Sequence, residues 1–285
     1  MKRSSFVLYC AVLGLLPSAC GPGLESEANG ERSDSTLVDR DHLAITVSGR
    51  AELFPEAARL QMARGQPLPS LEGFTLTVEE PLLTGVSDAD AVFGRGNVGA
   101  DGAFSVPNIS VRDIHLSLAA TLEHDGFVRT SSVVFDTIFT RTRPSTDIVE
   151  AHAWALPNAF HDTLTRSIGE SWIRALTEDR ARTLRAAGFI LGRVVDASGA
   201  PVRGARVALD RGDLVGRVYY PAADFQSATQ DATSDTGLFV YVHSGADTET
   251  FGMAVQGQRD YVLRNVGATP GMALVVTLTP GTTAP

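Results

Sequence analysis

The sequence predicts an all-β protein with two tandem β-sandwich domains that are joined by one amphipathic α-helix. Short runs of β-branched and aromatic residues alternate with turn residues through most of the chain after residue 43. One segment, residues 158–187, has instead the four-residue apolar spacing of a helix. Hydrophobic residues make up 44% of the 285-residue chain, which is enough for two separate cores.

The N-terminus has the layout of an export signal. Lys2 and Arg3 precede an apolar run over residues 6–16 that is too short to span a bilayer as a permanent helix. Small residues then lead directly to Cys20. This arrangement resembles the lipobox of bacterial lipoproteins, which implies a signal peptide over residues 1–19 and a diacylated cysteine as the mature N-terminus. A secreted protein that is cleaved after an Ala-x-Ala-like site is the alternative.

Cysteine usage favours the lipid anchor. Cys10 lies inside the apolar run and would leave with the signal peptide, so Cys20 is the one cysteine of the mature chain. This count excludes a disulfide, and acylation explains why an exported chain keeps a single thiol. Palmitate and similar acyl chains at this position would hold the protein on a membrane. Because Gly21 rather than Asp follows, the resemblance implies the outer membrane, with the protein facing the periplasm or the cell surface.

Composition limits the partners and the chemistry. Residues 20–42 are acidic and almost free of large apolar side chains, so we expect a disordered tether there, and a short disordered tail at residues 281–285. The net charge of -9 disfavours nucleic acid as a partner. Lys2 is the only lysine, and its removal with the signal peptide excludes Schiff-base and P-loop chemistry.

The first predicted sandwich covers residues 43–157. Its alternating segments are residues 44–50, 74–78, 104–106, 114–120 and 128–135, followed by a further strand at residues 148–154. An insertion at residues 53–62 contains Pro55, which can open a short helix.

The connecting helix is predicted over residues 158–187. Asn158 can cap its start, and Gly188 is placed to end it. Its apolar stripe consists of Phe160, Leu164, Ile168, Trp172 and Leu176. We expect this stripe, Trp172 included, to be buried against one or both sandwiches, so that the helix is a rigid connection. A helix that binds a partner is the alternative.

The second predicted sandwich covers residues 188–280. Its turn and strand signals are Asp196 to Gly199, Pro201, residues 202–209, Asp235 to Gly237, and residues 238–242. These residues resemble the carboxypeptidase regulatory-like domain, a transthyretin-like β-sandwich of Ig-like architecture. The resemblance implies an accessory module rather than a catalyst, and none of the residues that carry it has a chemical role.

Three landmarks recur in the same order in both predicted sandwiches. The pairs are residues 46–49 with 190–192, residues 65–68 with 199–202, and residues 101–104 with 235–239. We therefore interpret the first sandwich as a diverged copy of the second. Chance similarity between β-turns is the alternative.

The sequence carries no recognisable catalytic motif. The zinc carboxypeptidases that contain the resembled module use an H-x-x-E pair, and none of the six histidines begins one. Residues 94–99 match G-x-G-x-x-G, but a strand rather than a helix is expected next, so we interpret them as a glycine-rich turn. His161, beside Asp162, is interpreted as a solvated residue of the first helical turn. We therefore predict no catalysis, no metal and no cofactor.

Three functions remain open. The first is a lipid-anchored, non-enzymatic scaffold of the bacterial envelope or cell surface that binds an unknown envelope protein. The second is a carbohydrate-binding surface lipoprotein, because related sandwiches bind glycans with exposed aromatic side chains. The candidate residues for glycan or partner contact are Tyr219, Tyr220, Phe225, Tyr241 and Tyr261. The third is an enzyme of unrecognised type.

Overall fold

The structure is a computed structural model that describes residues 39–81, 83, 91–140 and 142–281. The predicted signal peptide, Cys20, and most of the predicted tether and tail lie outside these residues. The described residues belong to one compact unit, Val38–Pro285. Within the described part of the chain, none of the helices is both long and apolar enough to cross a bilayer.

The fold is all-β with short helices, as the sequence predicts. The elements of the first half are β1 (Ala44–Leu53), α1 (Pro55–Ala63), β2 (Thr75–Glu79), β3 (Val92–Asn97), β4 (Ala103–Ser110), β5 (Ser117–Glu123), β6 (Phe127–Asp136), α3 (Thr137–Thr140) and β7 (Ile148–Pro157). The helix α1 begins at Pro55, as predicted, since proline at the first helical position costs no hydrogen bond.

The strands of the first half form two layers around one core. β1 pairs with β4 in antiparallel and with β7 in parallel orientation. In the other layer β6, β5, β2 and β3 are antiparallel neighbours. Alternating residues such as Val47, Leu76 and Phe104 are buried between the layers. β6 also pairs with β7 through Val128 and Leu156, which makes the two layers continuous at one corner.

The second half has a similar arrangement. Its elements are α4 (Asn158–Ile168), α5 (Glu170–Leu176), α6 (Leu184–Ala187), β8 (Phe189–Val194), β9 (Val207–Leu209), η1 (Gly212–Arg217), β10 (Val218–Pro221), β11 (Ala228–Thr229), β12 (Leu238–Val242), β13 (Glu249–Val255), β14 (Arg264–Ala268) and β15 (Met272–Leu278). One layer has the order β11, β10, β12, β8 and β15, and the other has the order β14, β13 and β9. Ile190, Phe239 and Phe251 are buried between them.

The two halves share two strand pairings. Gly49 of β1 lies opposite Phe104 of β4, and Gly192 of β8 lies opposite Phe239 of β12. In each half this glycine-containing strand has a parallel partner on its other side, β7 in the first half and β15 in the second. Two of the three sequence landmarks therefore occupy matching register positions, and the internal repeat stays a prediction.

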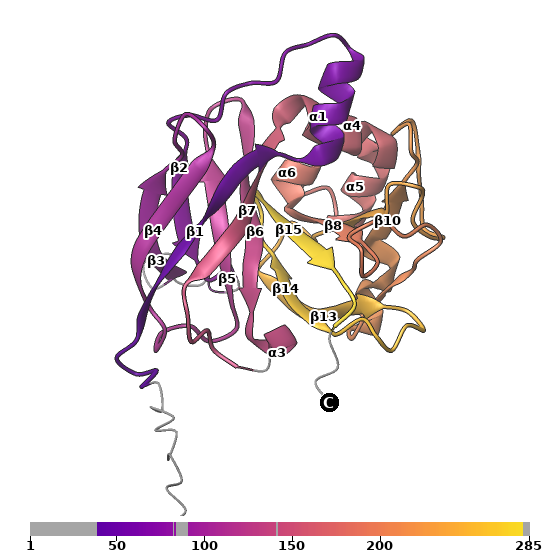
Figure 1. Ribbon diagram of the computed structural model, residues 1–285. Helices are drawn as coiled ribbons and strands as arrows, with labels where there is room; N and C mark the ends of the chain where they lie inside the picture. Colours follow the sequence, from indigo (N-terminus) through magenta and orange to yellow (C-terminus); the bar gives the residue numbers. More distant parts are fainter. Residues whose placement is uncertain (1–38, 82, 84–90, 141, 282–285) are drawn as a thin grey trace, which may run out of the picture. The chain divides into compact units, whose positions relative to one another are not determined.

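A parallel strand pair joins the halves into one sheet. β15 of the second half pairs with β6 of the first, from Met272 opposite Arg129 to Val275 opposite Ser132 (Figure 1). Among the described residues the resulting sheet has 12 strands. Strands of both predicted sandwiches belong to this sheet. The boundary between the two predicted domains stays a prediction.

The connecting segment contains three short helices rather than the one helix predicted. Gly169 has φ 97°, a conformation that ends α4 and starts α5 at an angle. The stripe residues Phe160, Leu164 and Ile168 are buried, as predicted, and they share a core with β8, β12 and β15. The helices thus cover the face of the second-half sheet that is turned away from β13 and β14, and this sheet is buried on both faces (Figure 1).

Two further expectations were wrong. Trp172 is 60% exposed rather than buried, because the break at Gly169 turns α5 so that Ile173 packs inward in its place. Gly94 and Gly96 lie in β3 rather than in a turn. A Cβ at Gly94 would stand 2.7 Å from the Val106 side chain of β4, so glycine lets these two strands approach closely.

We expect Gly192→Ala to destabilise the protein by about 1–3 kcal/mol, because a Cβ there would overlap the ring of Phe239 across the β8–β12 pair. Urea unfolding followed by circular dichroism measures the difference. Gly216→Ala is the matched control, since a Cβ there has no described atom within 4 Å, and it should cost less than about 0.5 kcal/mol. Equal stability of the two variants would contradict this strand register.

Candidate functional site

Four of the five aromatic residues predicted to contact a glycan are in the core. Tyr219, Tyr220, Phe225 and Tyr241 are 6%, 4%, 2% and 0% exposed, respectively. The prediction that they form an exposed stacking surface is therefore wrong. The reason is that other elements cover both faces of the second-half sheet. The side chains of β10 and β12 are therefore buried whichever face they lie on.

The hydroxyl groups of Tyr220 and Tyr241 have internal partners. Tyr220 Oη accepts a hydrogen bond from the backbone N–H of Val207 at 2.8 Å. Tyr241 Oη donates to Glu249 Oε2 at 2.5 Å. Burial raises the pKa of both hydroxyls, and for Tyr241 the adjacent carboxylate raises the pKa further. These groups stabilise the fold.

Tyr261 is half-buried and lines a pocket of about 420 Å³. We call this the Tyr261 pocket. The polar side chains that line it are Arg203, Arg206, Gln256, Gln258 and Tyr261, and buried Ala205 lies among them. Residues 202–206 precede β9, whereas residues 255–261 follow from the end of β13, so the pairing of these two strands brings the two walls together.

The first wall is held by Thr233, which is 3% exposed. Its hydroxyl donates to the carbonyl of Val202 at 2.7 Å and accepts from the N–H of Ala205 at 2.9 Å. Its backbone carbonyl accepts from the N–H of Gly204 at 2.8 Å, and its N–H donates to the carbonyl of Ala205 at 2.9 Å. Four hydrogen bonds to one buried residue therefore fix the loop that carries Arg203 and Arg206.

The second wall is tied to the first. The N–H of Gln256 donates to the carbonyl of Arg206 at 2.8 Å. Tyr261 forms an isolated β-bridge with Pro280, and its hydroxyl donates to the carbonyl of Val195 at 2.8 Å. The ring of Tyr261 is thus held at both the backbone and the hydroxyl while it lines the pocket.

The charged side chains around the pocket differ in whether they have a partner. Arg203 Nη1 lies 3.1 Å from Asp235 Oδ1 in an exposed ion pair. Asp196 accepts from Ser198 and Ala200 in its own turn, and these hydrogen bonds, that of the Ser198 hydroxyl first, hold the pKa of Asp196 below its usual value. Arg206 forms no ion pair with any described carboxylate. Its guanidinium is the charged group of the pocket that is open to a ligand.

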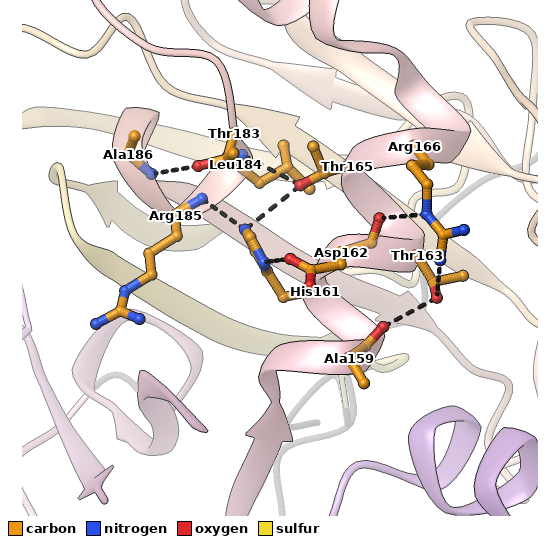
Figure 2. Close-up of polar contacts among 10 residues, drawn as sticks. All are labelled: Ala159, His161, Asp162, Thr163, Thr165, Arg166, Thr183, Leu184, Arg185 and Ala186. Atoms are coloured by element: carbon orange, nitrogen blue, oxygen red, sulfur yellow. Dashed lines mark hydrogen bonds and ion pairs between the residues drawn. The ribbon is translucent and has the colours of Figure 1, made fainter. Parts of the chain in front are cut away.

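A second candidate, buried His161, forms a structural cap (Figure 2). The side chain is 4% exposed, which corrects the expectation of a solvated residue. Its Nε2 accepts from the N–H of Arg185 at 2.9 Å, so Nδ1 carries the proton and donates to Asp162 Oδ1 at 2.9 Å. Thr165 accepts from the N–H of Leu184 at 3.4 Å in the same way. Side chains of α4 therefore satisfy backbone donors at the start of α6.

The pH dependence of stability tests this role. Burial lowers the pKa of His161, with the hydrogen bond to Asp162 opposing the shift. The unfolded chain then binds a proton at a higher pH than the folded chain, so stability is complete above about pH 6.5 and declines as the pH falls from there toward the folded-state pKa. We expect His161→Ala to cost about 1–3 kcal/mol at neutral pH and to weaken this decline.

Urea unfolding at several pH values between about 7.5 and about 5 measures both effects. His152→Ala is the matched control, because its imidazole is 57% exposed, and it should keep the decline. A decline of the same size in the His161→Ala protein would assign the pH dependence to other groups.

No described group of three or more His, Cys, Asp or Glu side chains is placed to hold a metal ion. Sequence inspection identified Tyr261 but missed Arg203, Arg206, Gln256 and Gln258. The signal was weak, because Arg203, Gln256 and Gln258 adjoin glycines in turn-like sequence, and only the fold brings the two segments together. The fold defines an all-β protein with a 12-stranded and a 3-stranded sheet among its described residues, and the Tyr261 pocket is one of its pockets.

No family model and no curated protein matches the sequence. Among solved structures, the shaft pilin SpaA from Lactobacillus rhamnosus GG is similar at 9% identity over 85% of this chain and 100% of that chain, with a TM-score of 0.24. A streptococcal ancillary pilin is similar at 9% identity over 84% of this chain and 69% of that chain, with a TM-score of 0.23.

The Bacillus anthracis TIE protein is similar at 9% identity over 83% of this chain, with a TM-score of 0.23. The chain spans 34% of the length of that protein. Likenesses of this degree carry no argument about function, so the functional proposal is based on this chain alone.

Proposed function

We propose that this protein is a lipid-anchored, non-enzymatic scaffold of a bacterial envelope that is exported and displays a rigid β-structure to an envelope protein. The observation that carries the proposal is Cys20, the one cysteine that would remain after a signal-peptide-like segment is removed. Gly21 after this cysteine favours the outer membrane as the destination. The acidic residues between Cys20 and β1 would separate the folded part from the lipid surface.

The roles of three buried polar side chains support a scaffold. Glu80 accepts from the backbone N–H groups of Leu116 at 2.5 Å and Ser117 at 3.3 Å, so its carboxylate fixes the start of β5. Glu79 pairs with Arg129 at 2.9 Å within the shared sheet. His243 lies 2.8 Å from the carbonyls of both Ala187 and Asp247, and so joins α6 to the loop after β12. Each group stabilises the junctions between elements, as a structural role requires.

Metabolic labelling tests the anchor. We expect the wild-type protein to incorporate radioactive palmitate and to fractionate with membranes, whereas Cys20→Ala should take up no label and should be recovered in the soluble fraction. Cys10→Ala is the matched control and should keep the label, because that cysteine would leave with the signal peptide. An unlabelled wild type, or a Cys20→Ala protein that stays on membranes in detergent-sensitive form, would rule out the lipid anchor.

A further inference from the structure

We propose that the Tyr261 pocket binds a carboxylated saccharide. This inference is independent of the lipid anchor, because the pocket lies entirely within the described residues. Its volume of about 420 Å³ falls within the range of small-molecule sites, roughly 300–1,000 Å³. A pocket of this size has room for one or two sugar rings but not for a folded partner, and further rings of a longer saccharide would extend outside it.

The lining combines the three kinds of group that an acidic sugar requires. The ring of Tyr261 presents an apolar surface on which the C–H face of a sugar can pack. The amides of Gln256 and Gln258 each offer two N–H donors and a carbonyl acceptor, which suits neighbouring hydroxyl groups. The planar guanidinium of Arg206 can bind a carboxylate with two parallel hydrogen bonds.

The surrounding charges favour a ligand with one carboxylate per ring over a more highly charged anion. Arg203 forms an exposed ion pair with Asp235, whereas Arg206 has no ion-pair partner among the described carboxylates and is the cation we expect a carboxylate to contact first. Asp196 and Asp260 are close enough to raise the pKa of Tyr261, although burial of its hydroxyl is the larger cause. These carboxylates repel every anion in proportion to its charge, so they disfavour a phosphate or a nucleic acid more than a sugar ring with one carboxylate, and the chain as a whole has a net charge of -9.

The pocket is ordered before any ligand arrives. The hydrogen bonds of Thr233 fix one wall, and those of Tyr261 and Gln256 fix the other and join it to the first. A preformed site loses little conformational entropy on binding, so a few hydrogen bonds and one aromatic contact are sufficient for measurable affinity. This order distinguishes the pocket from an accidental depression between mobile surface loops.

Isothermal titration calorimetry with a trimer of galacturonic acid, and with the matching neutral galactose trimer, tests the proposal. We expect the acidic trimer to bind at least about tenfold more tightly than the neutral one, since the guanidinium–carboxylate contact is charge-assisted. Arg206→Gln should reduce this difference to about twofold or less. Tyr261→Ala should weaken binding of both trimers by about tenfold or more, whereas Tyr261→Phe keeps the ring and should retain most of the affinity.

Arg211→Gln is the matched control, because this arginine pairs with Asp213 outside the pocket, and it should bind like the wild type. Circular dichroism and urea unfolding verify that each variant is folded. Absence of binding by the wild type at millimolar concentrations of acidic trimer would overturn the proposal. So would unchanged affinity in folded Arg206→Gln, or tighter binding of a short acidic peptide than of the trimer at the same Arg206-dependent site.

Discussion

The parallel pairing of β6 with β15 is the interaction on which the rest of the architecture depends. β15 also pairs with β8, so one strand connects the two halves: Met272–Val275 pair with β6, and Ala273–Leu278 pair with β8. The residues of β6 at this position, Thr130, Ser131 and Ser132, are at most 1% exposed. Polar side chains are tolerated there because they are hydrogen-bonded: the Ser131 hydroxyl donates to Glu79 at 3.0 Å, and the backbone N–H of Trp154 donates to the Ser132 hydroxyl at 2.8 Å.

This pairing determines which surfaces remain for function. The second-half sheet has the helices on one face and β9, β13 and β14 on the other, so its aromatic residues are in the two cores. Glu56 of α1 and Arg193 of β8 form an ion pair between the halves, and Arg193 also lies over the ring of Phe54. Binding chemistry is therefore left to the loops at the ends of strands. The Tyr261 pocket is built there, on turns that buried hydrogen bonds hold in place.

Local signals in the sequence predicted the local structure well. Pro55 predicted the start of α1, and the four-residue spacing of Phe160, Leu164 and Ile168 predicted a buried helical stripe. Alternation in strands indicates which residues share a face, but it does not reveal whether a second layer covers that face. For this reason the prediction that Tyr219 is exposed was wrong. Likewise, Trp172 fits the helical period, yet the positive φ at Gly169 breaks the helix before it. The pocket depends on contacts between residues about fifty positions apart, which no local pattern encodes.

The central claim is that the shared sheet makes the two halves one cooperative structure. Differential scanning calorimetry of the mature chain tests it directly. We expect a single unfolding transition, with a ratio of calorimetric to van't Hoff enthalpy of about 1. Two resolved transitions, or a ratio of about 2, would show that the halves unfold independently and would contradict the account.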